Sequence, residues 1–246
     1  PVMMAVLSKN IIRTMISHAS IVLDDTIDIQ YTNAGWRICG MDSSKVALIE
    51  INVWSQSMES YEFQSYTEGE ESPQIAVIPL GKLVEAMAVL PDDSVIAVTD
   101  DGVTFRLDSG KYHIKIREEG IFTQVKVPDV KSGCSFGLNT ADLNKMLVSA
   151  KNIRDEISIS CGQDGLTLAI VDDTGLEGME YTDSEITFER DVSSRYPLDF
   201  VVNAFRGMRG DVLMELDNDY LLKVVCTDPF TTMFLLAPRI VSESEE

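Results

Sequence analysis

An internal repeat constrains the fold of this chain more than any other feature of its sequence. Three segments of the first half recur in the second half in the same order. The matched segments are 7–19 with 138–150, 26–42 with 156–172, and 79–95 with 197–213. In the first pair, Ile12 meets Leu143 and Met15 meets Met146. One match could arise between any two amphipathic segments, but three in order indicate two copies of one unit. Each copy is predicted to run strand, helix, several strands, second helix and further strands.

The stretch GWRICGMDSSKVALIEINV, residues 35–53, shows how the strands of this unit are built. Trp36 and Ile38 alternate with polar residues, a polar group from Met41 to Ser44 follows, and alternation then resumes. This pattern predicts a strand, a tight turn and a second strand. Hairpin turns are likewise predicted at Asp100-Asp101-Gly102 and Asp108-Ser109-Gly110.

The domain boundaries follow from the repeat and from a change in composition. Residues 118–133, EEGIFTQVKVPDVKSG, combine Gly, Pro and charges without helical periodicity and predict a surface connector. The predicted organisation is a first domain at 1–117, the connector at 118–133, a second domain at 134–241 and an acidic tail at 242–246.

Four segments have the apolar periodicity of helices packed on a core, and each also has a polar side. The residues predicted to face the core are Ile12, Met15, Ile16 and Ala19; Leu80, Leu83, Val84 and Met87; Leu143, Met146, Leu147 and Ala150; and Leu198, Val201, Val202 and Phe205. Strands dominate elsewhere, so the predicted class is α+β.

The charge of the chain argues against a generally basic surface. The 20 Lys and Arg residues stand against 40 Asp and Glu residues, which gives a net charge of −20. No acidic residue occurs from Pro1 to Leu23, however, and the polar sides of the four helices carry few acids. Basic residues on such helices can simply form a solvated face, but this segregation favours a helical surface that meets DNA phosphates through non-specific contacts. The candidate contacts are Lys9, Arg13, Lys82, Lys145, Asn152 and Arg206, with Lys151, Arg154 and Arg209 as secondary candidates.

The remaining composition favours a reducing cytoplasmic protein with no membrane contact. The four cysteines (Cys39, Cys134, Cys161 and Cys226) form no CxxC pair, so we expect buried thiols and neither a disulfide nor a zinc site. No run approaches the roughly 18 apolar residues of a membrane helix. The first twenty residues lack the apolar block and cleavage site of a targeting peptide.

Several motifs resemble those of a known family. GMDSSKVALIE (40–50), NDYLLKVV (218–225) and FLLAPRI (234–240), on this duplicated unit with its Pro-containing connector, resemble the DNA polymerase sliding clamp, the proliferating cell nuclear antigen, in its archaeal type. The resemblance covers essentially the whole chain. It implies a DNA-clamp fold of two similar domains, with sheets outside and two helices per domain on the inner face.

The resemblance also implies a function. Three copies would close into a ring around duplex DNA and tether DNA polymerase, ligase and nucleases in replication and repair. A separate ATP-driven clamp loader would open the ring, so no cofactor, metal or catalytic residue is expected in this chain. The sequence has neither a Walker loop nor a GxGxxG motif.

Ring closure in this family pairs an edge strand of one subunit with an edge strand of the next. The implied segments are 111–117 and 176–182. Their residues are Lys111, Tyr112, His113, Ile114, Lys115, Ile116 and Arg117, and Leu176, Glu177, Gly178, Met179, Glu180, Tyr181 and Thr182. The alternation in KYHIKIR fits an edge strand, although an interior strand would show the same pattern.

Partner proteins of the family insert a short peptide, a glutamine followed by an aliphatic and two aromatic residues, into an apolar pocket beside the connector. The implied pocket residues are Met41, Val46, Leu48, Val125, Val127, Pro128, Leu221, Leu235, Ala237, Pro238 and Ile240. Leu221 and Leu235 depart from residues common in relatives, which bears on partner preference. A flexible methionine at the mouth would suit varied peptides.

Two other interpretations remain open from the sequence. The chain could be one subunit of a heterotrimeric or checkpoint-type clamp. It could also be a metal-dependent hydrolase that uses the acidic pairs Asp24-Asp25, Asp92-Asp93, Asp100-Asp101 and Asp172-Asp173. These pairs mostly lie at predicted turns, where Asp is favoured for local hydrogen bonding, and neither histidine is near one in the sequence.

Overall fold

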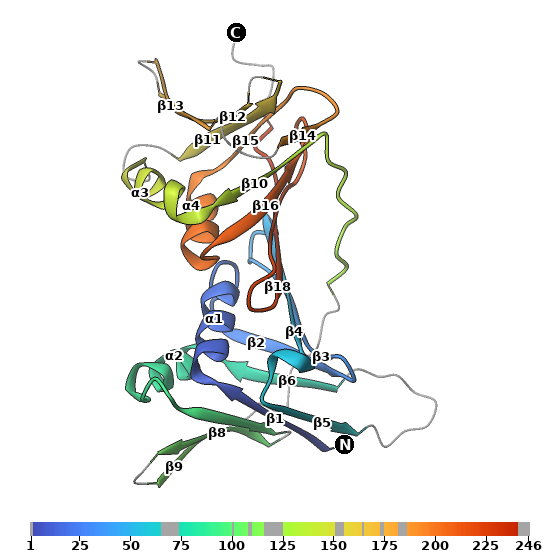
Figure 1. Cartoon of the computed structure of the whole chain (residues 1–246), viewed down its shortest axis with the longest axis vertical. Coiled ribbons are helices and arrows are strands. Elements are labelled where there is room, and N and C mark those ends of the chain that lie inside the picture. The colour runs from blue at the N-terminus through green and yellow to red at the C-terminus, as the bar shows by residue number, and fades with distance from the viewer. Residues whose placement is uncertain are drawn as a thin grey trace. The chain divides into compact units, whose positions relative to one another are not determined.

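In the part that the structure describes, the chain folds into sheets with four α-helices, which confirms the predicted α+β class (Figure 1). The computed structural model describes residues 2–64, 74–99, 101–107, 110–115, 125–150, 155–163, 165–172, 175–181 and 186–240. The elements of the first half are β1 (Val2–Ser8), α1 (Lys9–Ala19), β2 (Thr26–Thr32), β3 (Gly35–Met41), β4 (Ala47–Trp54), the short 3-10 helix η1 (Ser55–Ser57), β5 (Ser60–Gln64), β6 (Gln74–Pro79), α2 (Leu80–Val89), β7 (Val95–Thr99), β8 (Gly102–Leu107) and β9 (Gly110–Lys115). None of the helices within these described ranges is long and apolar enough to cross a membrane.

The second half repeats the order of helices and strands of the first. Its elements are β10 (Cys134–Asn139), α3 (Thr140–Ala150), β11 (Glu156–Gly162), β12 (Gly165–Asp172), β13 (Gly175–Tyr181), β14 (Ile186–Phe188), β15 (Val192–Pro197), α4 (Leu198–Gly207), β16 (Asp211–Leu216), β17 (Leu222–Cys226) and β18 (Thr231–Leu236). Both halves therefore run strand, helix, five strands, helix and three strands. The repeat predicted from the sequence is confirmed.

The order of strands within the sheets repeats as well. The strand orders of the first half are β5-β1-β7-β8-β9, a sheet of its own, and β4-β3-β2-β6. The corresponding orders of the second half are β13-β12-β11-β15 for β4-β3-β2-β6, and β14-β10-β16-β17-β18 for β5-β1-β7-β8-β9; β14-β10-β16-β17-β18 and β4-β3-β2-β6 are consecutive parts of one nine-stranded sheet. The two helices of each half lie beside one another, α1 with α2 and α3 with α4 (Figure 1).

The chain divides into two compact units. Unit 1 contains Pro1–Asp42, Ile49–Lys126 and Asp228–Thr232, and unit 2 contains Ser43–Leu48, Val127–Thr227 and Met233–Glu246. The main division falls after Lys126, inside the segment expected to be a connector. Each unit also includes a short segment from the other half of the chain.

Matching backbone hydrogen bonds fix the second helix of each unit. The N–H of Leu80 donates to the carbonyl of Asp25, and the N–H of Leu198 donates to the carbonyl of Asp155, each at 2.9 Å. Both helices begin directly after a proline, whose fixed φ suits a helix start. The two units thus place the second helix in the same way.

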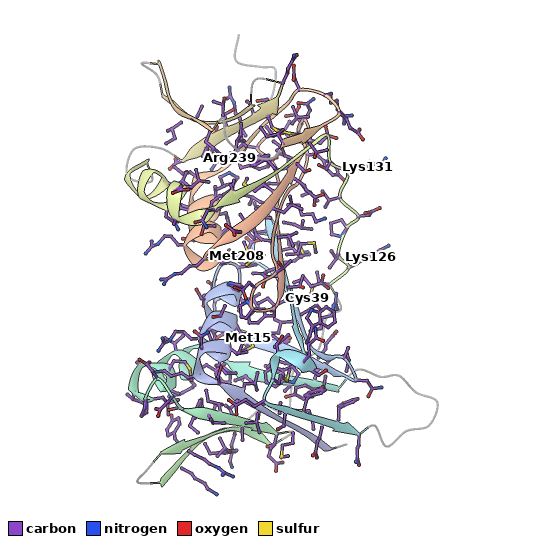
Figure 2. All side chains as sticks on the ribbon, in the orientation of Figure 1. Met15, Cys39, Lys126, Lys131, Met208 and Arg239 are labelled. Carbon is purple, nitrogen blue, oxygen red and sulfur yellow. A yellow bond between two sulfur atoms is a disulfide. The ribbon has the colours of Figure 1, made fainter. Side chains whose placement is uncertain are left out.

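The predicted helix cores are confirmed for most of the residues that the structure describes. All four predicted residues of α1 and of α4 are buried, and Met15 lies in the interior of unit 1 (Figure 2). In α2 the prediction is wrong for Val84, which is 48% exposed, while Ala86 is buried. Met146 and Ala150 of α3 lie outside the residues whose side chains are described.

The predicted turns are confirmed where the structure describes them. Strand β3 ends at Met41 and β4 begins at Ala47, as the opening stretch indicates. Thr99 pairs with Gly102 and Leu107 with Gly110 across the two hairpins. Gly102 has a φ of 150°, a conformation that favours glycine.

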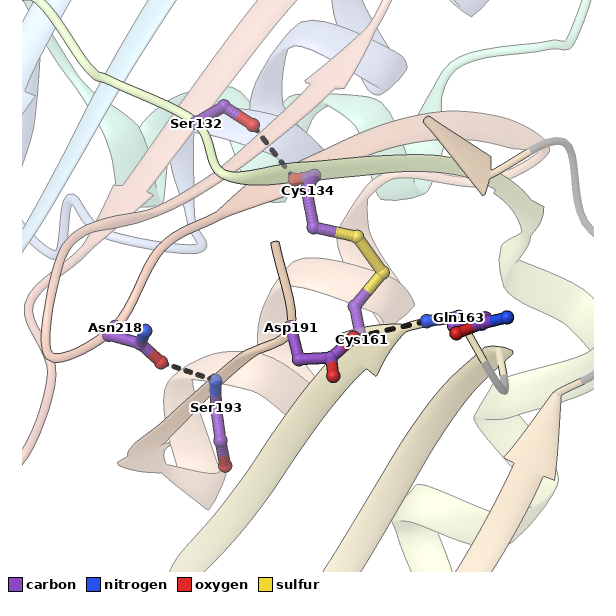
Figure 3. Close-up of a disulfide and its surroundings, with 7 residues drawn as sticks. All are labelled: Ser132, Cys134, Cys161, Gln163, Asp191, Ser193 and Asn218. Atoms are coloured by element: carbon purple, nitrogen blue, oxygen red, sulfur yellow. Dashed lines mark hydrogen bonds between the residues drawn. A yellow bond between two sulfur atoms is a disulfide. The ribbon is translucent and has the colours of Figure 1, made fainter. Parts of the chain in front are cut away.

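The expectation of four free thiols is wrong for one pair of cysteines. Cys134 of β10 and Cys161 of β11 form a disulfide with a Cα–Cα distance of 6.3 Å (Figure 3). The two strands belong to different sheets of unit 2, so the bond links those sheets. The sequence separation of 27 matches no short cysteine motif, and the pair becomes visible only once the sheets are stacked. Cys39 and Cys226 are free.

Candidate nucleic-acid interface and partner surfaces

Helix α1 was expected to present Lys9 and Arg13 on an exposed side, and this is wrong for Lys9. The Lys9 side chain is only 5% exposed, because the loop after α2 covers it. Its Nζ donates to the carbonyl of Leu90 and to Oδ1 of Asp92, at 3.1 Å for the latter. The backbone N–H of Lys9 also donates to the carbonyl of Ser94, at 3.0 Å. In this structure the ammonium of Lys9 is therefore engaged within unit 1.

Arg13 is one helical turn further on and does reach the surface, with its side chain 54% exposed. Its Nη2 lies 3.0 Å from the same Oδ1 of Asp92 that Lys9 contacts. Hydrogen bonds from Lys9 and then Arg13 lower the pKa of Asp92 below its ordinary value. On α2, exposed Lys82 has Nζ 3.4 Å from Oε2 of Glu85. All three candidate cations of unit 1, Lys9, Arg13 and Lys82, are thus paired with carboxylates.

The candidate DNA contacts in unit 2 differ from those in unit 1, because the described ones are not paired with carboxylates. Arg206, in the last turn of α4, and Arg209, just beyond it, are exposed. Within the described part of the chain, neither forms an ion pair. The side chain of Lys145 and all of Asn152, Lys151 and Arg154 lie outside the described residues. Two arginines at the end of α4 are therefore the described free cations among the candidates.

The two segments implied for ring closure lie on strands at sheet edges, among the strands that the structure describes. Strand β9 pairs with β8 and ends one sheet, and β13 pairs with β12 and ends another. The edge position expected of KYHIKIR is therefore confirmed for Lys111–Lys115. Ile116, Arg117 and Thr182 lie outside the described residues, as do the side chains of Leu176–Tyr181.

An exposed apolar group lies next to strand β9. Val89 is 77% exposed, and Tyr112 of β9 is exposed as well. A depression of about 250 Å³ lies between α2, β8 and β9, lined by Glu85, Ala86, Val89, Leu90, Phe105 and Tyr112. Exposed apolar surface beside an unpaired strand edge is typical of an interaction surface.

One of the implied docking residues of unit 2, Val46, is hydrogen-bonded to the C-terminal segment. The N–H of Ala237 donates to the carbonyl of Val46 at 2.9 Å, which joins the segment before β4 to the segment after β18. The N–H of Arg239 donates to the carbonyl of Arg195, and Arg239 Nη1 lies 2.8 Å from Glu156 Oε1. These contacts fix residues 237–239 on unit 2 and leave Ile240 exposed.

The implied docking residues differ widely in exposure. Leu48 and Leu235 are buried, so their side chains belong to the core in this structure. Val46, Val127, Leu221, Ala237 and Pro238 are half-buried, and Pro128 is exposed. Lys126 and Lys131 are also exposed. They lie before and after residues 127–130 of the connector, and their side chains point away from it (Figure 2).

Two further docking residues belong to unit 1. Met41 is exposed at the end of β3, as its place at the lip of the turn predicts. Val125 is half-buried, and its carbonyl lies 4.0 Å from the thiol sulfur of Cys39. Burial raises the pKa of that thiol to about 11, so it remains protonated at neutral pH.

Sequence reasoning missed Asp92 as a neighbour of the α1 cations. It treated Asp92-Asp93 only as one of several acidic pairs that might hold a metal. The contact joins residues 83 positions apart, so no local pattern could reveal it. Among the described residues, no cluster of three or more His, Cys, Asp or Glu could hold a metal ion.

The fold of this chain is similar to that of a protein of known structure. A crystal structure of the proliferating cell nuclear antigen of Entamoeba histolytica superimposes with a TM-score of 0.84, covering 97% of this chain and 99% of that one, at 18% identity. The fold is therefore that of the DNA clamps. No family model matches the chain.

Two curated archaeal proteins are similar to the chain along its sequence. A DNA polymerase sliding clamp of Thermoplasma acidophilum is 22% identical, covering 94% of this chain and 93% of that protein. Another from Cenarchaeum symbiosum is 25% identical, covering 94% of this chain and 95% of that protein. The chain is thus similar in fold to a DNA clamp and in sequence, over almost its whole length, to archaeal sliding clamps.

Proposed function

We propose that this protein is a DNA sliding clamp, a processivity factor that encircles duplex DNA and tethers a replicative polymerase. The observation that carries the proposal is the similarity to sliding clamps over almost the whole chain, on a fold that repeats one unit twice. We propose that it has no enzymatic activity of its own and acts at the nucleoid in the cytoplasm. The metal-dependent hydrolase has no comparable support.

We further propose that three copies assemble head to tail into a ring. Two features support this arrangement. Strands β9 and β13 are edge strands in different units, and an unpaired edge is a template for pairing with another chain. The exposed apolar side chains of Val89 and Tyr112 beside β9 would gain from being covered.

The charges of the two edges support pairing between them. In a chain with a net charge of −20, β9 carries the exposed Lys111 and Lys115. The sequence of β13 carries Glu177 and Glu180. Opposite charges on two different edges favour a contact between unlike edges and disfavour a contact between like ones.

Within such a ring, the helices would face the DNA and meet its phosphates without reading bases. Arg206 and Arg209 are the described candidates that are free to do so. A few screened contacts suit a protein that must move along DNA, since this electrostatic binding weakens steeply with salt. Retention would then depend on closure of the ring.

We also propose that partner proteins dock on the connector and the C-terminal segment of unit 2. The half-buried apolar side chains of Val46, Val127 and Ala237 and the exposed Ile240 support this surface. The partners would be polymerase, ligase and nucleases carrying a short peptide motif, and a clamp loader would open the ring.

The decisive experiment measures retention on DNA of different topology. The protein, loaded by a clamp loader onto nicked circular DNA, should remain bound through gel filtration and should be lost once the circle is cut. Retention that persists on linear DNA would contradict the sliding function. Light scattering of the purified chain should give a trimer, whereas a monomer at micromolar concentration would favour the heterotrimeric alternative.

A further inference from the structure

A single carboxylate oxygen joins the two basic residues of α1. Oδ1 of Asp92 lies 3.1 Å from Lys9 Nζ and 3.0 Å from Arg13 Nη2. The Asp92 side chain is itself 88% exposed. Oδ1 of Asp92 thus accepts hydrogen bonds from two cationic side chains. A phosphate oxygen of DNA would be bound by cationic side chains in the same way.

The second unit shows how the same joint between helix and loop is held without charges. In the repeat, Thr140 takes the place of Lys9, Asn144 that of Arg13 and Gly210 that of Ser94, and the loop after α4 is two residues shorter than the loop after α2, with no counterpart of Asp92. The N–H of Thr140 donates to the carbonyl of Gly210 at 2.9 Å, as the N–H of Lys9 does to Ser94. The N–H of Gly210 in turn donates to Oγ1 of Thr140 at 3.0 Å. Asn144 Nδ2 donates to the carbonyl of Phe205 at 2.9 Å.

The helix and the loop are held together in unit 2 by backbone and neutral groups alone. Charged side chains are therefore not needed for this contact between helix and loop. In unit 1 the buried Lys9 keeps the carbonyl of Leu90 as a second acceptor. A pair as exposed as Arg13 and Asp92 contributes little to folding. Asp92 compensates the buried ammonium of Lys9, whereas its contact with Arg13 brings the fold no comparable gain.

We propose that Asp92 is an intramolecular competitor of DNA phosphate that limits how tightly the clamp holds duplex DNA. The inference rests on the proposed clamp function and deepens it. To bind a phosphate, Arg13 must leave Asp92, and the carboxylate then repels the phosphate that replaces it. The contact weakens the grip of unit 1 and leaves Arg206 and Arg209 of unit 2 as the uncompensated cations.

The experiment compares Asp92→Asn with Asp93→Asn in binding to a short linear duplex. Both substitutions remove one negative charge from the same loop. Asp93 is exposed and forms no ion pair with any described residue, so it is a matched control. Fluorescence anisotropy of a labelled duplex, measured from about 50 to about 200 mM salt, covers the range in which phosphate contacts are lost.

Asp92→Asn should bind the duplex about two- to fivefold more tightly for each subunit in contact. The slope of log Kobs against log salt should become steeper by about 0.9 for each cation released to a phosphate. Asp93→Asn should change the affinity and the salt slope only by the small effect of removing one remote negative charge. In an Arg13→Gln background, the gain from Asp92→Asn should shrink, because Arg13 is the exposed cation that it releases.

Three results would overturn the proposal: an equal gain from the two substitutions, no gain from Asp92→Asn, or an undiminished gain in the Arg13→Gln background. Thermal unfolding of each variant identifies any loss of folding. Failure of the clamp function itself has a different signature, since the wild-type protein would then not be retained on nicked circles. Retention of the wild type with no gain from Asp92→Asn would disprove this inference alone.

Discussion

His18 is the buried histidine of α1 and contacts a segment from the far end of the chain. Its Nδ1 lies 2.7 Å from Oγ1 of Thr232, and its ring meets the edge of Phe230 at a centroid distance of 5.4 Å. Burial lowers the pKa of His18 from 6.5 to about 4. The imidazole is therefore neutral in the folded protein at neutral pH. It helps to fix Asp228–Thr232, the short segment that unit 1 takes from the second half.

We predict that this histidine makes the protein sensitive to mild acid. Because the folded pKa is below the unfolded one, the unfolded chain binds more protons between pH 6.5 and about 4. The contribution of His18 is fully present above pH 6.5 and is lost as the pH falls through this window, up to about 3 kcal/mol. Urea unfolding at a series of pH values measures the loss.

The second histidine of the chain provides the control. His18→Gln, which does not titrate, should flatten the pH dependence over that range. The same change at the exposed His113 should leave the dependence as it is. Equal pH dependence in the wild type and His18→Gln would assign the acid sensitivity to other groups.

The disulfide acts at the scale of elements, because it joins β10 and β11 across the two sheets of unit 2. At the corresponding places of the repeat, unit 1 has Met3 and Tyr31, both buried. The two units thus fill the same part of the core in different ways, one with a covalent bond and one with large side chains.

Reduction of this bond should lower the stability of the protein. Closing a loop of 27 residues in the unfolded chain is worth about 3–4 kcal/mol in the chain-entropy model. The midpoint of denaturant unfolding should therefore fall when a reductant is added. Cys134→Ala/Cys161→Ala should already have the lower midpoint and should not respond to reductant. A response that persists in the double variant would point to Cys39 or Cys226.

The elements show where prediction from sequence succeeds and where it stops. The apolar stripes of α1 and α4 were predicted because their period is a local property of the sequence. Val84 was misplaced because a helical wheel cannot show how far the neighbouring sheet extends over a helix. Lys9 and the disulfide were misjudged for one reason, since each contact depends on residues brought together by tertiary packing.

At the scale of the whole molecule, the repeat was the strongest signal in the sequence. It predicted the element order of both halves, because a duplicated unit repeats its pattern of apolar residues. The sequence could not predict that each compact unit includes a short segment of the other half. Nor could it define the docking surface, where Leu48 and Leu235 are buried, because burial depends on the packed neighbours of a side chain.

Assembly should respond to charge in a way that identifies the paired edges. We predict that Lys111→Glu/Lys115→Glu and Glu177→Lys/Glu180→Lys each weaken self-association by at least about tenfold, because the two edges then carry charges of the same sign. Combining all four substitutions in one chain should restore association, since opposite charges again meet. Sedimentation of the three variants over a range of concentrations measures the effect.

The combined variant is the critical sample in this series. If it stays as dissociated as either double variant, β9 and β13 are not partners. If neither double variant dissociates, the edge charges do not contribute to assembly. A contact between two copies of β9 would be sensitive to the first pair of substitutions only.

The neutral joint in unit 2 has a consequence for how such a protein evolves. Lys9 keeps the carbonyl of Leu90 as an acceptor, and Thr140, Asn144 and Gly210 hold the matching helix and loop of unit 2 together without charge, so the architecture can persist with a neutral residue at position 92. A single nucleotide change converts an aspartate codon into one for asparagine or glycine. The hold on DNA is then a trait that selection can adjust by one-step mutations, separately from the inherited scaffold.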